Sequence, residues 1–471
     1  MSRPSTVSEL RQSGYRPLSV KQELRENVIA RIKSEQPLFP GIIGYDDTVI
    51  PQAVNALLSK HDILFLGLRG QAKSRMIRTL PDLLDEYVPT VAGVELPDDP
   101  LAPKLKQTKD LLAEKGEATP IDWIHRSERF NEKLATPDVT VADLIGEIDL
   151  VKHAEGRHLS DESIMHFGLV PRSNRGIFAI NELPDLPPRI QVSLFNVLQE
   201  RDVQIRGFSV HLNLDVFIVF TANPEDYTNR GRIVTPLKDR IGSVIRTHYP
   251  SRLEQSIEIT RQNAIIERDA SRPVTVPSFM HEIIEETVRL ARESPHINQQ
   301  SGVSVRTSIA ATEALVSNAE RRAIVLNEPR VVPRVSDLPN IAAGCRGKLE
   351  LMLADDEKAE DKLLAALVGE AVKNVFRNYG DEEPLDGIVA QFADGKAALE
   401  VGDDVPVADF LQAVAKCPDL DDAARQVCSN AGLDSDDPCQ RACAAEFILE
   451  YLYVSNRLTK YAYHGRTFYK R

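Results

Sequence analysis

The stretch His61-Asp-Ile-Leu-Phe-Leu-Gly-Leu-Arg-Gly-Gln-Ala-Lys-Ser74 decides the fold. Its first half is a short apolar run that ends at Gly67, as a buried parallel strand would. Helical periodicity follows from Lys73 to about Leu84. A glycine-bearing loop between a strand and a helix is the setting of a phosphate-binding P-loop, because backbone N–H groups and the helix N-terminus face phosphate oxygens there. The stretch therefore predicts an α/β nucleotide-binding domain.

The loop residues expected to bind a nucleotide are Gly67, Arg69, Gly70, Gln71, Ala72, Lys73 and Ser74. Lys73 would pair with the β and γ phosphates, and the Ser74 hydroxyl would bind Mg²⁺. The pattern G-x-x-x-x-G-K-[ST] has glycine where this chain has Ala72, and a methyl group is tolerated there only if φ is negative. The alternative interpretation is an ordinary strand–turn–helix unit with an exposed lysine.

Two polar residues end a second apolar run, Gly176-Ile-Phe-Ala-Ile-Asn181-Glu182. They would lie at the carboxyl edge of the sheet, where open α/β sheets bind ligands. A P-loop ATPase uses an aspartate at the first position for the Mg²⁺ shell and a glutamate at the second to polarise the attacking water. Asn181 can still accept a hydrogen bond from a Mg²⁺-bound water but carries no charge, so weaker Mg²⁺ affinity or slower turnover is expected. The alternative is a strand end capped by solvated polar residues.

Asn223 and two arginines extend this series. Asn223 follows the apolar run 216–220 and could orient the water, or it could simply form a turn with Pro224. Arg240 precedes the predicted domain break, and Arg306 begins a helix. An arginine from a neighbouring subunit can stabilise charge on a transferring phosphoryl group, whereas the alternative for each arginine is a surface salt bridge. The order of all these motifs favours a catalytic site over the separate alternatives.

The organisation of the chain changes near residue 250. Before it, the apolar runs 176–180 and 216–220 alternate with helical patterns, which predicts a parallel sheet. Residues 85–140 are polar and contain several prolines, and we interpret them as an insertion. Beyond residue 250 we find only helical patterns. The predicted regions are an N-terminal helical lead-in (1–35), an α/β nucleotide-binding domain (36–250), a helical region (251–355) and a C-terminal helical region of unknown role (356–471).

Composition narrows the class of protein. The chain has 471 residues, 42% of them hydrophobic, and a formal net charge of −13. Such a composition is that of a globular protein, and the acid excess argues against general binding to nucleic acid or to an anionic membrane. No apolar run approaches the roughly 20 residues of a membrane span, and no signal peptide is visible. Five cysteines, an odd number, fit a reducing compartment. We expect a cytoplasmic protein without a membrane span.

The motif order resembles that of AAA+ ATPases of the MoxR and magnesium-chelatase I-subunit group. The stretch His166–Glu182 resembles the chelatase segment that leads into its Walker B strand. Leu198–Gly207 resembles the helix-to-hairpin step of MoxR proteins. Asn223-Pro-Glu225 resembles the sensor 1 segment of the chelatase subunit, and Leu237–Gly242 resembles its arginine-finger segment. The resemblance covers about residues 36–350.

The resemblance implies an AAA+ domain, with a P-loop parallel sheet flanked by helices and followed by an α-helical lid over residues 251–355. It implies that Ile43 and Gly44 flank the adenine of ATP. Asn223 would be sensor 1, Arg240 the arginine finger and Arg306 sensor 2. The cofactors would be ATP and Mg²⁺, with Mg²⁺ held by Ser74 and, through water, by Asn181.

The resemblance also implies a homo-oligomeric ring, usually a hexamer, that works on a client or adaptor protein, often one with a von Willebrand A domain. MoxR-like members help to load metal or cofactors into other proteins, and the chelatase subunit drives Mg²⁺ insertion into protoporphyrin. Because nothing in this chain indicates a porphyrin site, we favour a chaperone-like ATPase. The alternatives are a nucleotide-switched scaffold with little hydrolysis and the ATPase subunit of a true chelatase. Net charge weighs against a DNA-linked AAA+ regulator.

Overall fold

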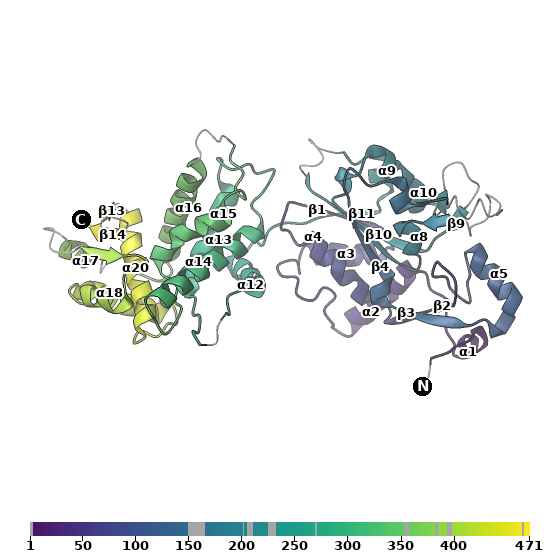
Figure 1. Cartoon of the computed structure of the whole chain (residues 1–471), viewed down its shortest axis with the longest axis horizontal. Coiled ribbons are helices and arrows are strands. Elements are labelled where there is room, and N and C mark those ends of the chain that lie inside the picture. Colours follow the sequence, from purple (N-terminus) through teal and green to yellow (C-terminus); the bar gives the residue numbers. More distant parts are fainter. Residues whose placement is uncertain are drawn as a thin grey trace. The chain divides into compact units, whose positions relative to one another are not determined.

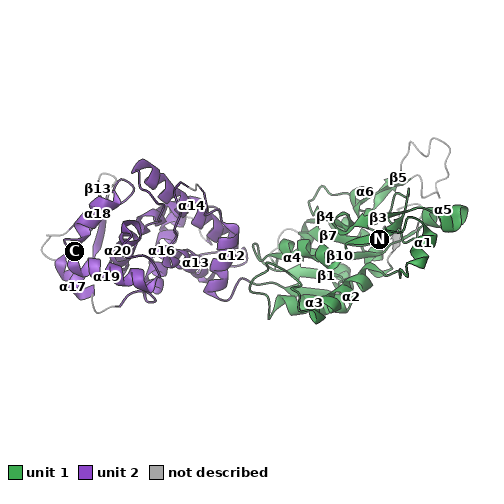
Figure 2. Ribbon diagram, turned by 90° about the horizontal axis from the view of Figure 1, so that it is seen from below, with its two compact units in different colours: residues 1–248 green, residues 249–471 purple. Residues whose placement is uncertain are grey.

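The computed structural model describes residues 3–148, 165–200, 202–204, 211–224, 232–268, 271–352, 358–381, 385–392, 398–463 and 466–471. The chain forms two compact units, Met1–His248 and Tyr249–Arg471 (Figure 2). The domain break that we predict near residue 250 lies beside this division. Among the described residues, no helix combines the length and the apolar character needed to cross a bilayer.

The first unit is built on a five-stranded parallel sheet with the order β11-β1-β10-β7-β4 (Figure 1). The strands are β1 (Ile63–Leu66), β4 (Phe130–Leu134), β7 (Gly176–Asn181), β10 (Val216–Ala222) and β11 (Ser243–Arg246). The expected α/β class and the three central strands are confirmed. The sequence did not reveal the edge strands β4 and β11. Each carries polar residues and is only partly buried, so neither forms a continuous apolar run.

Helices cover both faces of this sheet. On one face, Ile63 and Phe65 share a hydrophobic core with helices α2 (Val20–Lys33), α3 (Val49–Leu58) and α4 (Lys73–Thr79). On the other face, Leu64 shares a core with α9 (Pro188–Ser193) and α10 (Phe195–Gln199), as Figure 1 shows. Side chains alternate between the two layers because successive residues of a strand point to opposite faces.

Two predicted helices are shorter than expected. The helix expected to run to Leu84 ends at Thr79 and continues as the 3₁₀ turn η1 (Leu80–Leu83), which contains Pro81. A proline removes a backbone donor and so favours the end of an α-helix. The helix expected from Pro187 to Gln199 is divided into α9 and α10 at Leu194.

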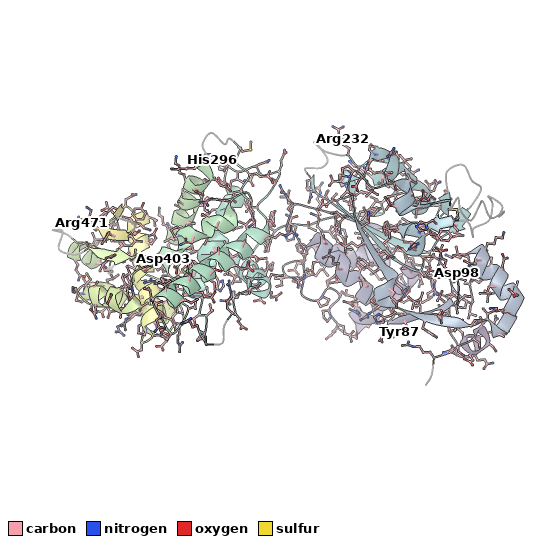
Figure 3. The ribbon with its side chains drawn as sticks, viewed as in Figure 1. Tyr87, Asp98, Arg232, His296, Asp403 and Arg471 are labelled. Carbon is pink, nitrogen blue, oxygen red and sulfur yellow. The ribbon has the colours of Figure 1, made fainter. Side chains whose placement is uncertain are left out.

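The predicted insertion, residues 85–140, contains strand β4 of the main sheet. It also contains an antiparallel pair of strands and a helix. Asp98, which is labelled in Figure 3, lies ahead of that helix. Its buried carboxylate accepts the N–H groups of Lys104 and Leu105, and burial raises the pKa of Asp98. The elements are β2 (Tyr87–Val91), α5 (Lys106–Lys115), η2 (Gly116–Ala118), β3 (Ile121–His125) and η3 (Arg126–Arg129).

The remaining elements of the first unit are short. They are α1 (Val7–Gln12), α6 (Val141–Leu144), β5 (Gly146–Ile148), β6 (Met165–Phe167), α8 (Leu169–Arg172), η5 (Leu183–Asp185), β8 (Asp202–Gln204), β9 (His211–Asn213) and α11 (Thr235–Arg240). The segments Leu198–Gly207 and Asn223–Glu225, which carry part of the family resemblance, extend into residues outside the described part of the chain.

The second unit is mostly helical. Its helices are α12 (Leu253–Asn263), α13 (Ser278–Glu293), α14 (Val305–Val325), η7 (Val335–Ile341), α15 (Ala342–Cys345), α16 (Ala359–Phe376), α17 (Leu385–Gln391), α18 (Val407–Val414), α19 (Pro418–Asn430) and α20 (Pro438–Val454). All five cysteines lie in this unit and are buried and free of disulfides.

The expectation of helices alone after residue 250 is wrong at the end of the chain. A three-stranded antiparallel sheet forms there, with the order β12-β14-β13. The strands are β12 (Leu399–Val401), β13 (Thr459–Tyr463) and β14 (Arg466–Lys470). They are short, and charged and aromatic residues are mixed within them, so no apolar run marks them.

One hydrophobic core runs through the second unit from Phe279 to Tyr469. Phe279 of α13 stacks on Phe447 of α20, with ring centroids 4.5 Å apart and an interplanar angle of 2°. Phe376 of α16 stacks on Tyr451 of α20 at 3.9 Å. The core thus draws side chains from both sides of residue 355, where we predict a regional boundary.

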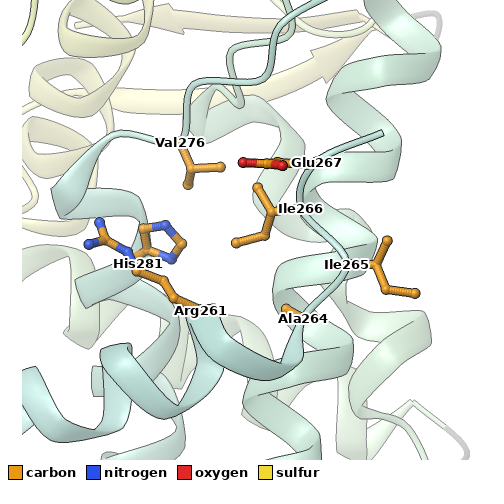
Figure 4. A pocket seen from close by; sticks show the side chains of 7 residues that line it. All are labelled: Arg261, Ala264, Ile265, Ile266, Glu267, Val276 and His281. Carbon is orange, nitrogen blue, oxygen red and sulfur yellow. The ribbon is translucent and has the colours of Figure 1, made fainter. Parts of the chain in front are cut away.

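A buried histidine in this unit predicts an acid-sensitive stability. His281 of α13 is 4% exposed and lines a small pocket beside Arg261 (Figure 4). Burial, with a smaller contribution from Arg261, lowers the pKa of His281 to about 4. The unfolded chain, with a histidine pKa of about 6.5, binds this proton first as the pH falls. The contribution of neutral His281 to the free energy of unfolding is therefore fully present above pH 6.5. It is lost as the pH falls from about 6.5 to 4.

We expect the free energy of unfolding of the second unit to fall by about 2 kcal/mol more in the native chain than in His281→Leu when the pH is lowered from 7 to 5. Urea titrations of the two full-length proteins at both pH values measure this difference. Equal pH dependence in the two proteins would contradict the prediction.

Candidate nucleotide-binding site

The polar residues singled out in the sequence lie at the carboxyl ends of three adjacent strands. The order β1-β10-β7 places the loop after β1, Asn223 after β10, and Asn181 and Glu182 at the end of β7 next to one another. Parallel strands end at the same edge of a sheet, so the topology brings together residues that are more than a hundred positions apart. Two hydrogen-bonded groups result.

The first group joins the loop lysine to the predicted catalytic glutamate. The Lys73 ammonium, 7% exposed as a residue, donates to Asn223 Oδ1 at 2.7 Å. It also donates to the carbonyl oxygens of Gly67 at 2.5 Å and Leu68 at 3.0 Å. Asn223 Nδ2 in turn donates to Glu182 Oε2 at 2.6 Å. One asparagine therefore links the cation at the phosphate loop to the carboxylate.

The second group surrounds the buried Asn181. Its amide oxygen accepts a hydrogen bond from Thr221 Oγ1 at 3.1 Å and a long one from Ser74 Oγ at 3.4 Å. Thr221 Oγ1 also accepts the N–H of Glu182 at 2.9 Å. Thr221 was not among the predicted residues. It lies on β10 two residues before Asn223, and a polar side chain at the end of an otherwise apolar run was the available signal.

A carboxylate that the sequence analysis missed lies behind this group. Asn181 Nδ2 donates to Glu132 Oε1. Glu132 lies on β4 and is also held by Arg78 of α4, with Nε to Oε2 at 2.8 Å and Nη2 to Oε1 at 3.1 Å. These hydrogen bonds to Glu132 raise the pKa of Arg78. Glu132 was missed because the strand that carries it was not predicted.

One residue of the phosphate loop, Ala72, has a backbone conformation that usually requires glycine. Ala72 has φ +53° and ψ 13°, in the left-handed region, and Gly70 has φ +76°. We expected a methyl group at position 72 to be tolerated only at negative φ, and the φ of Ala72 is positive. A left-handed conformation costs an L-residue with a Cβ about 1–2 kcal/mol. Glu182 is also left-handed, with φ +56°, so both sides of the site hold a strained residue.

We expect Ala72→Gly to stabilise the first unit. Relief of about 1–2 kcal/mol of backbone strain outweighs the roughly 0.5–1 kcal/mol that glycine costs through the unfolded chain. The thermal midpoint of this unit should rise by about 1–3 °C. Calorimetry of the full chain measures it. Ala30→Gly is the matched control, because Ala30 is an exposed residue within α2, where glycine should lower the midpoint. A lower midpoint for Ala72→Gly than for the native chain would contradict the prediction.

The loop is tied to its surroundings by side chains. Gln71 Oε1 accepts the N–H of Leu68 at 2.9 Å and the hydroxyl of Thr247 at 2.8 Å. A methyl group at Gly67 would overlap the side chains of Thr247 and Gln71, which explains why that position is glycine. The Tyr45 hydroxyl lies 2.8 Å from the Gln71 carbonyl oxygen. The predicted adenine-flanking residues therefore precede a tyrosine that is hydrogen-bonded to the loop.

The other predicted residues lie as follows. Ile43 and Gly44 are half-buried, and Gly44 has φ +80°. Arg69 is exposed. Arg240, at the end of α11, donates to Gln199 Oε1 at 2.9 Å, and Arg306 is exposed in the first turn of α14 in the second unit. Within the described part of the chain, neither Arg240 nor Arg306 is hydrogen-bonded to either of the two groups.

Comparison with known proteins finds relatives of this chain. A family model described as the sigma-54 interaction domain matches residues 125–244. The magnesium-chelatase subunit ChlI of Nostoc sp. is 24% identical over 326 residues, which cover 65% of this chain and 82% of that protein. The ChlI of Nephroselmis olivacea is 24% identical over 383 residues, which cover 76% and 99%. The chain is an AAA+ protein related to the magnesium-chelatase I subunits. The predicted likeness to the chelatase group is thereby confirmed.

A solved structure of the complex between subunits BchI and BchD of magnesium chelatase is also similar to this AAA+ protein. It is 21% identical, covers 70% of this chain and 100% of its own, and has a TM-score of 0.34. The sheet order and the loop between β1 and α4 establish the fold.

The residues of this AAA+ site fit the magnesium nucleotide that the family implies. Magnesium binds hard oxygen donors, and the Ser74 hydroxyl and the Asn181 amide oxygen, 3.4 Å apart, supply them at one strand edge. A phosphate chain needs cations and N–H donors. The Lys73 ammonium at the start of α4 provides the cation beside a helix N-terminus. Ser74 and Asn181 would hold the metal, and Lys73 the phosphates.

Proposed function

We propose that this protein is an AAA+ ATPase that uses the binding and hydrolysis of ATP in a homo-oligomeric ring to remodel or activate a client protein. The observation that carries the proposal is the hydrogen-bonded series Lys73–Asn223–Glu182 at the edge of the sheet. In this series the Lys73 ammonium, which can bind phosphate, and the Glu182 carboxylate, which can activate water, are both hydrogen-bonded to the Asn223 amide. The relationship to magnesium-chelatase I subunits supports the same class of activity.

Mg²⁺, when bound, would supply charge stabilisation for the phosphoryl group that is transferred. In our proposal Lys73 binds the β and γ phosphate oxygens, and the Ser74 hydroxyl would hold the metal. Glu182 accepts the proton of the attacking water, because a positioned carboxylate is a general base. Asn223 positions Glu182 through the 2.6 Å hydrogen bond. Ile43 and Gly44 are proposed to flank the adenine.

Arg240 is proposed to act between subunits. Arg240 ends a short helix and keeps its guanidinium partly exposed, 5.0 Å from the ring of Phe195. A guanidinium held near the surface by Gln199 can reach a nucleotide that a neighbouring copy binds. Arg306 is exposed in the second unit and is proposed as sensor 2. We propose a ring, with six subunits as the expected number, in the cytoplasm.

The proposed partner is a client or adaptor protein with a von Willebrand A domain, and metal or cofactor insertion is the proposed outcome. In the solved complex of BchI and BchD the I subunit pairs with a second chelatase subunit. We favour a chaperone-like role over a true chelatase subunit. Residues 251–355 are proposed to form the lid of the AAA+ domain. We assign no role to residues 356–471.

A specific observation favours one competing function, a nucleotide-switched scaffold with little hydrolysis. Asn181 has no charge where a P-loop ATPase has a carboxylate, and Ala72 strains the phosphate loop. Both features would slow turnover more than they would prevent binding. The two functions differ in whether phosphate is released.

The test is Mg²⁺-dependent phosphate release by the purified protein, with light scattering in the presence and absence of ATP. Release that EDTA abolishes, together with ATP-dependent growth in mass, is the expected result. Growth in mass without release would support the scaffold. Neither growth nor release, together with no nucleotide binding, would overturn the proposed function.

A further inference from the structure

The neutral Asn181 has a carboxylate as its direct neighbour. Strand β4 pairs in parallel with β7 so that Glu132 lies beside Ala179, and Leu134 beside Asn181. Paired residues point to the same face of a sheet, and so do residues two apart on a strand. Glu132 and Asn181 therefore share the face on which Ala179 packs in the core with α4. This is the face that carries Ser74 and Arg78.

The contacts of Asn181 fix which way its amide points. Nδ2 donates to Glu132, and Oδ1 accepts from Thr221 Oγ1 and Ser74 Oγ. A carboxylate can only accept hydrogen bonds. A flipped amide would place its oxygen against the carboxylate of Glu132, so that carboxylate keeps the amide oxygen turned toward Ser74.

Glu132 also brings negative charge to this side of the site. Its side chain is 20% exposed, whereas that of its partner Arg78 is 64% exposed. Water and salt screen the exposed guanidinium more than the mostly buried carboxylate, so the ion pair leaves a net negative field toward Asn181. The two hydrogen bonds from Arg78 hold the carboxylate in place.

We propose that Glu132 is a positioning residue for Mg²⁺. From the neighbouring strand, Glu132 supplies the negative charge that Asn181 lacks, and it turns the Asn181 amide oxygen toward Ser74. Asn181 and Glu132 together then do the work of a single carboxylate. The inference rests on the proposed nucleotide site. It assigns a function to a residue outside the loop and the two strand ends on which that site was built.

The test is a charge exchange between the two positions. Affinity for a fluorescent ATP analogue is measured in the full chain as Mg²⁺ is titrated, and again in EDTA. We expect Glu132→Gln to raise the Mg²⁺ concentration needed for half-maximal effect about tenfold, as for residues that orient metal ligands. Affinity in EDTA should stay within about twofold, because Glu132 does not act on the phosphates.

The double variant Glu132→Gln/Asn181→Asp gives the sharper result. It moves the carboxylate to position 181 and leaves an amide at position 132 that can donate to it. We expect it to recover the native Mg²⁺ dependence to within about threefold. Asn181→Asp alone places two carboxylates in contact and should bring no gain in Mg²⁺ affinity, because like charges oppose each other. Glu128→Gln, an exposed glutamate near β4, is the control and should change nothing.

The outcomes separate this inference from the proposed function. A native chain that binds the analogue with Mg²⁺ dependence, and a Glu132→Gln variant with the same dependence, would overturn the role of Glu132 alone. A tenfold gain in Asn181→Asp with Glu132 intact would also overturn it. A native chain that binds no nucleotide would overturn both. If Glu132→Gln unfolds, the folded double variant decides the question. Native Mg²⁺ dependence of analogue binding in the double variant supports the proposal, and an altered Mg²⁺ dependence overturns it.

Discussion

Lys73→Ala is expected to abolish nucleotide binding at micromolar concentrations. The Lys73 ammonium is the cation of the first hydrogen-bonded group, with partners at 2.5 to 3.0 Å. A hydrogen bond to a charged group contributes about 1.5–3 kcal/mol. Two such bonds to phosphate oxygens amount to a loss of about 10²–10⁴ in affinity. Titration of a fluorescent ATP analogue with Mg²⁺ present measures this change.

The control for Lys73→Ala is Lys33→Ala. Lys33 is an exposed lysine in the last turn of α2, so this substitution removes the same charge from the same unit. It should leave affinity unchanged. Because Lys73 also bonds to loop carbonyls, far-ultraviolet circular dichroism should first establish that Lys73→Ala is folded. Affinity within threefold of the native chain in a folded Lys73→Ala protein would refute the role of Lys73 at the phosphates.

Glu182→Gln is expected to stop turnover while nucleotide stays bound. Glutamine keeps an oxygen that can accept the hydrogen bond from Asn223 Nδ2, so the geometry of the first group is preserved. It cannot take a proton from water. General base catalysis contributes about 10²–10⁴ to a rate, and phosphate release should fall by that factor. Glutamine also has a Cβ, so the left-handed strain at this position is the same in both proteins.

Phosphate release and analogue affinity are measured side by side for Glu182→Gln. The affinity should remain within about threefold of the native value, because no phosphate contact is lost. Glu128→Gln serves as the control for the change of charge. Native phosphate release in Glu182→Gln would remove Glu182 from the mechanism. Loss of binding and release together would point instead to a role in holding the loop.

The central part of the fold could be predicted from the sequence because β1, β7 and β10 are buried on both faces. Full burial forces a run of apolar residues, and the polar residue after each run then marks the edge of the sheet. Glu182 and Asn223 were found in this way, and Lys73 was found from the glycine-bearing loop that follows the first run. The structure shows that they form one hydrogen-bonded series, which strand order, and not the linear sequence, determines.

The rest could not be predicted because edge strands carry no such run. Strand β4 reads Phe-Asn-Glu-Lys-Leu, and its residues are half-buried or exposed. Glu132 therefore looked like one charged residue among many in a polar segment. Thr221 was missed for a different reason: its polar side chain near the end of an apolar run was a signal, but its role follows only from its contacts with Asn181 and Glu182. The left-handed conformation of Ala72 could not be predicted either. The sequence indicates that alanine at this position needs a negative φ, but it does not give the dihedral angle.

The stacked rings of the second unit have a consequence for how this protein can have diverged from its relatives. Phe279 lies before residue 355 and its stacking partner Phe447 lies after it. A descendant that lost the last hundred residues would expose Phe279 and the rest of that apolar face to water, which favours aggregation. Shortening of the chain would thus have to be accompanied by substitutions along α13. Because the two regions share one core, neither keeps its apolar face covered without the other.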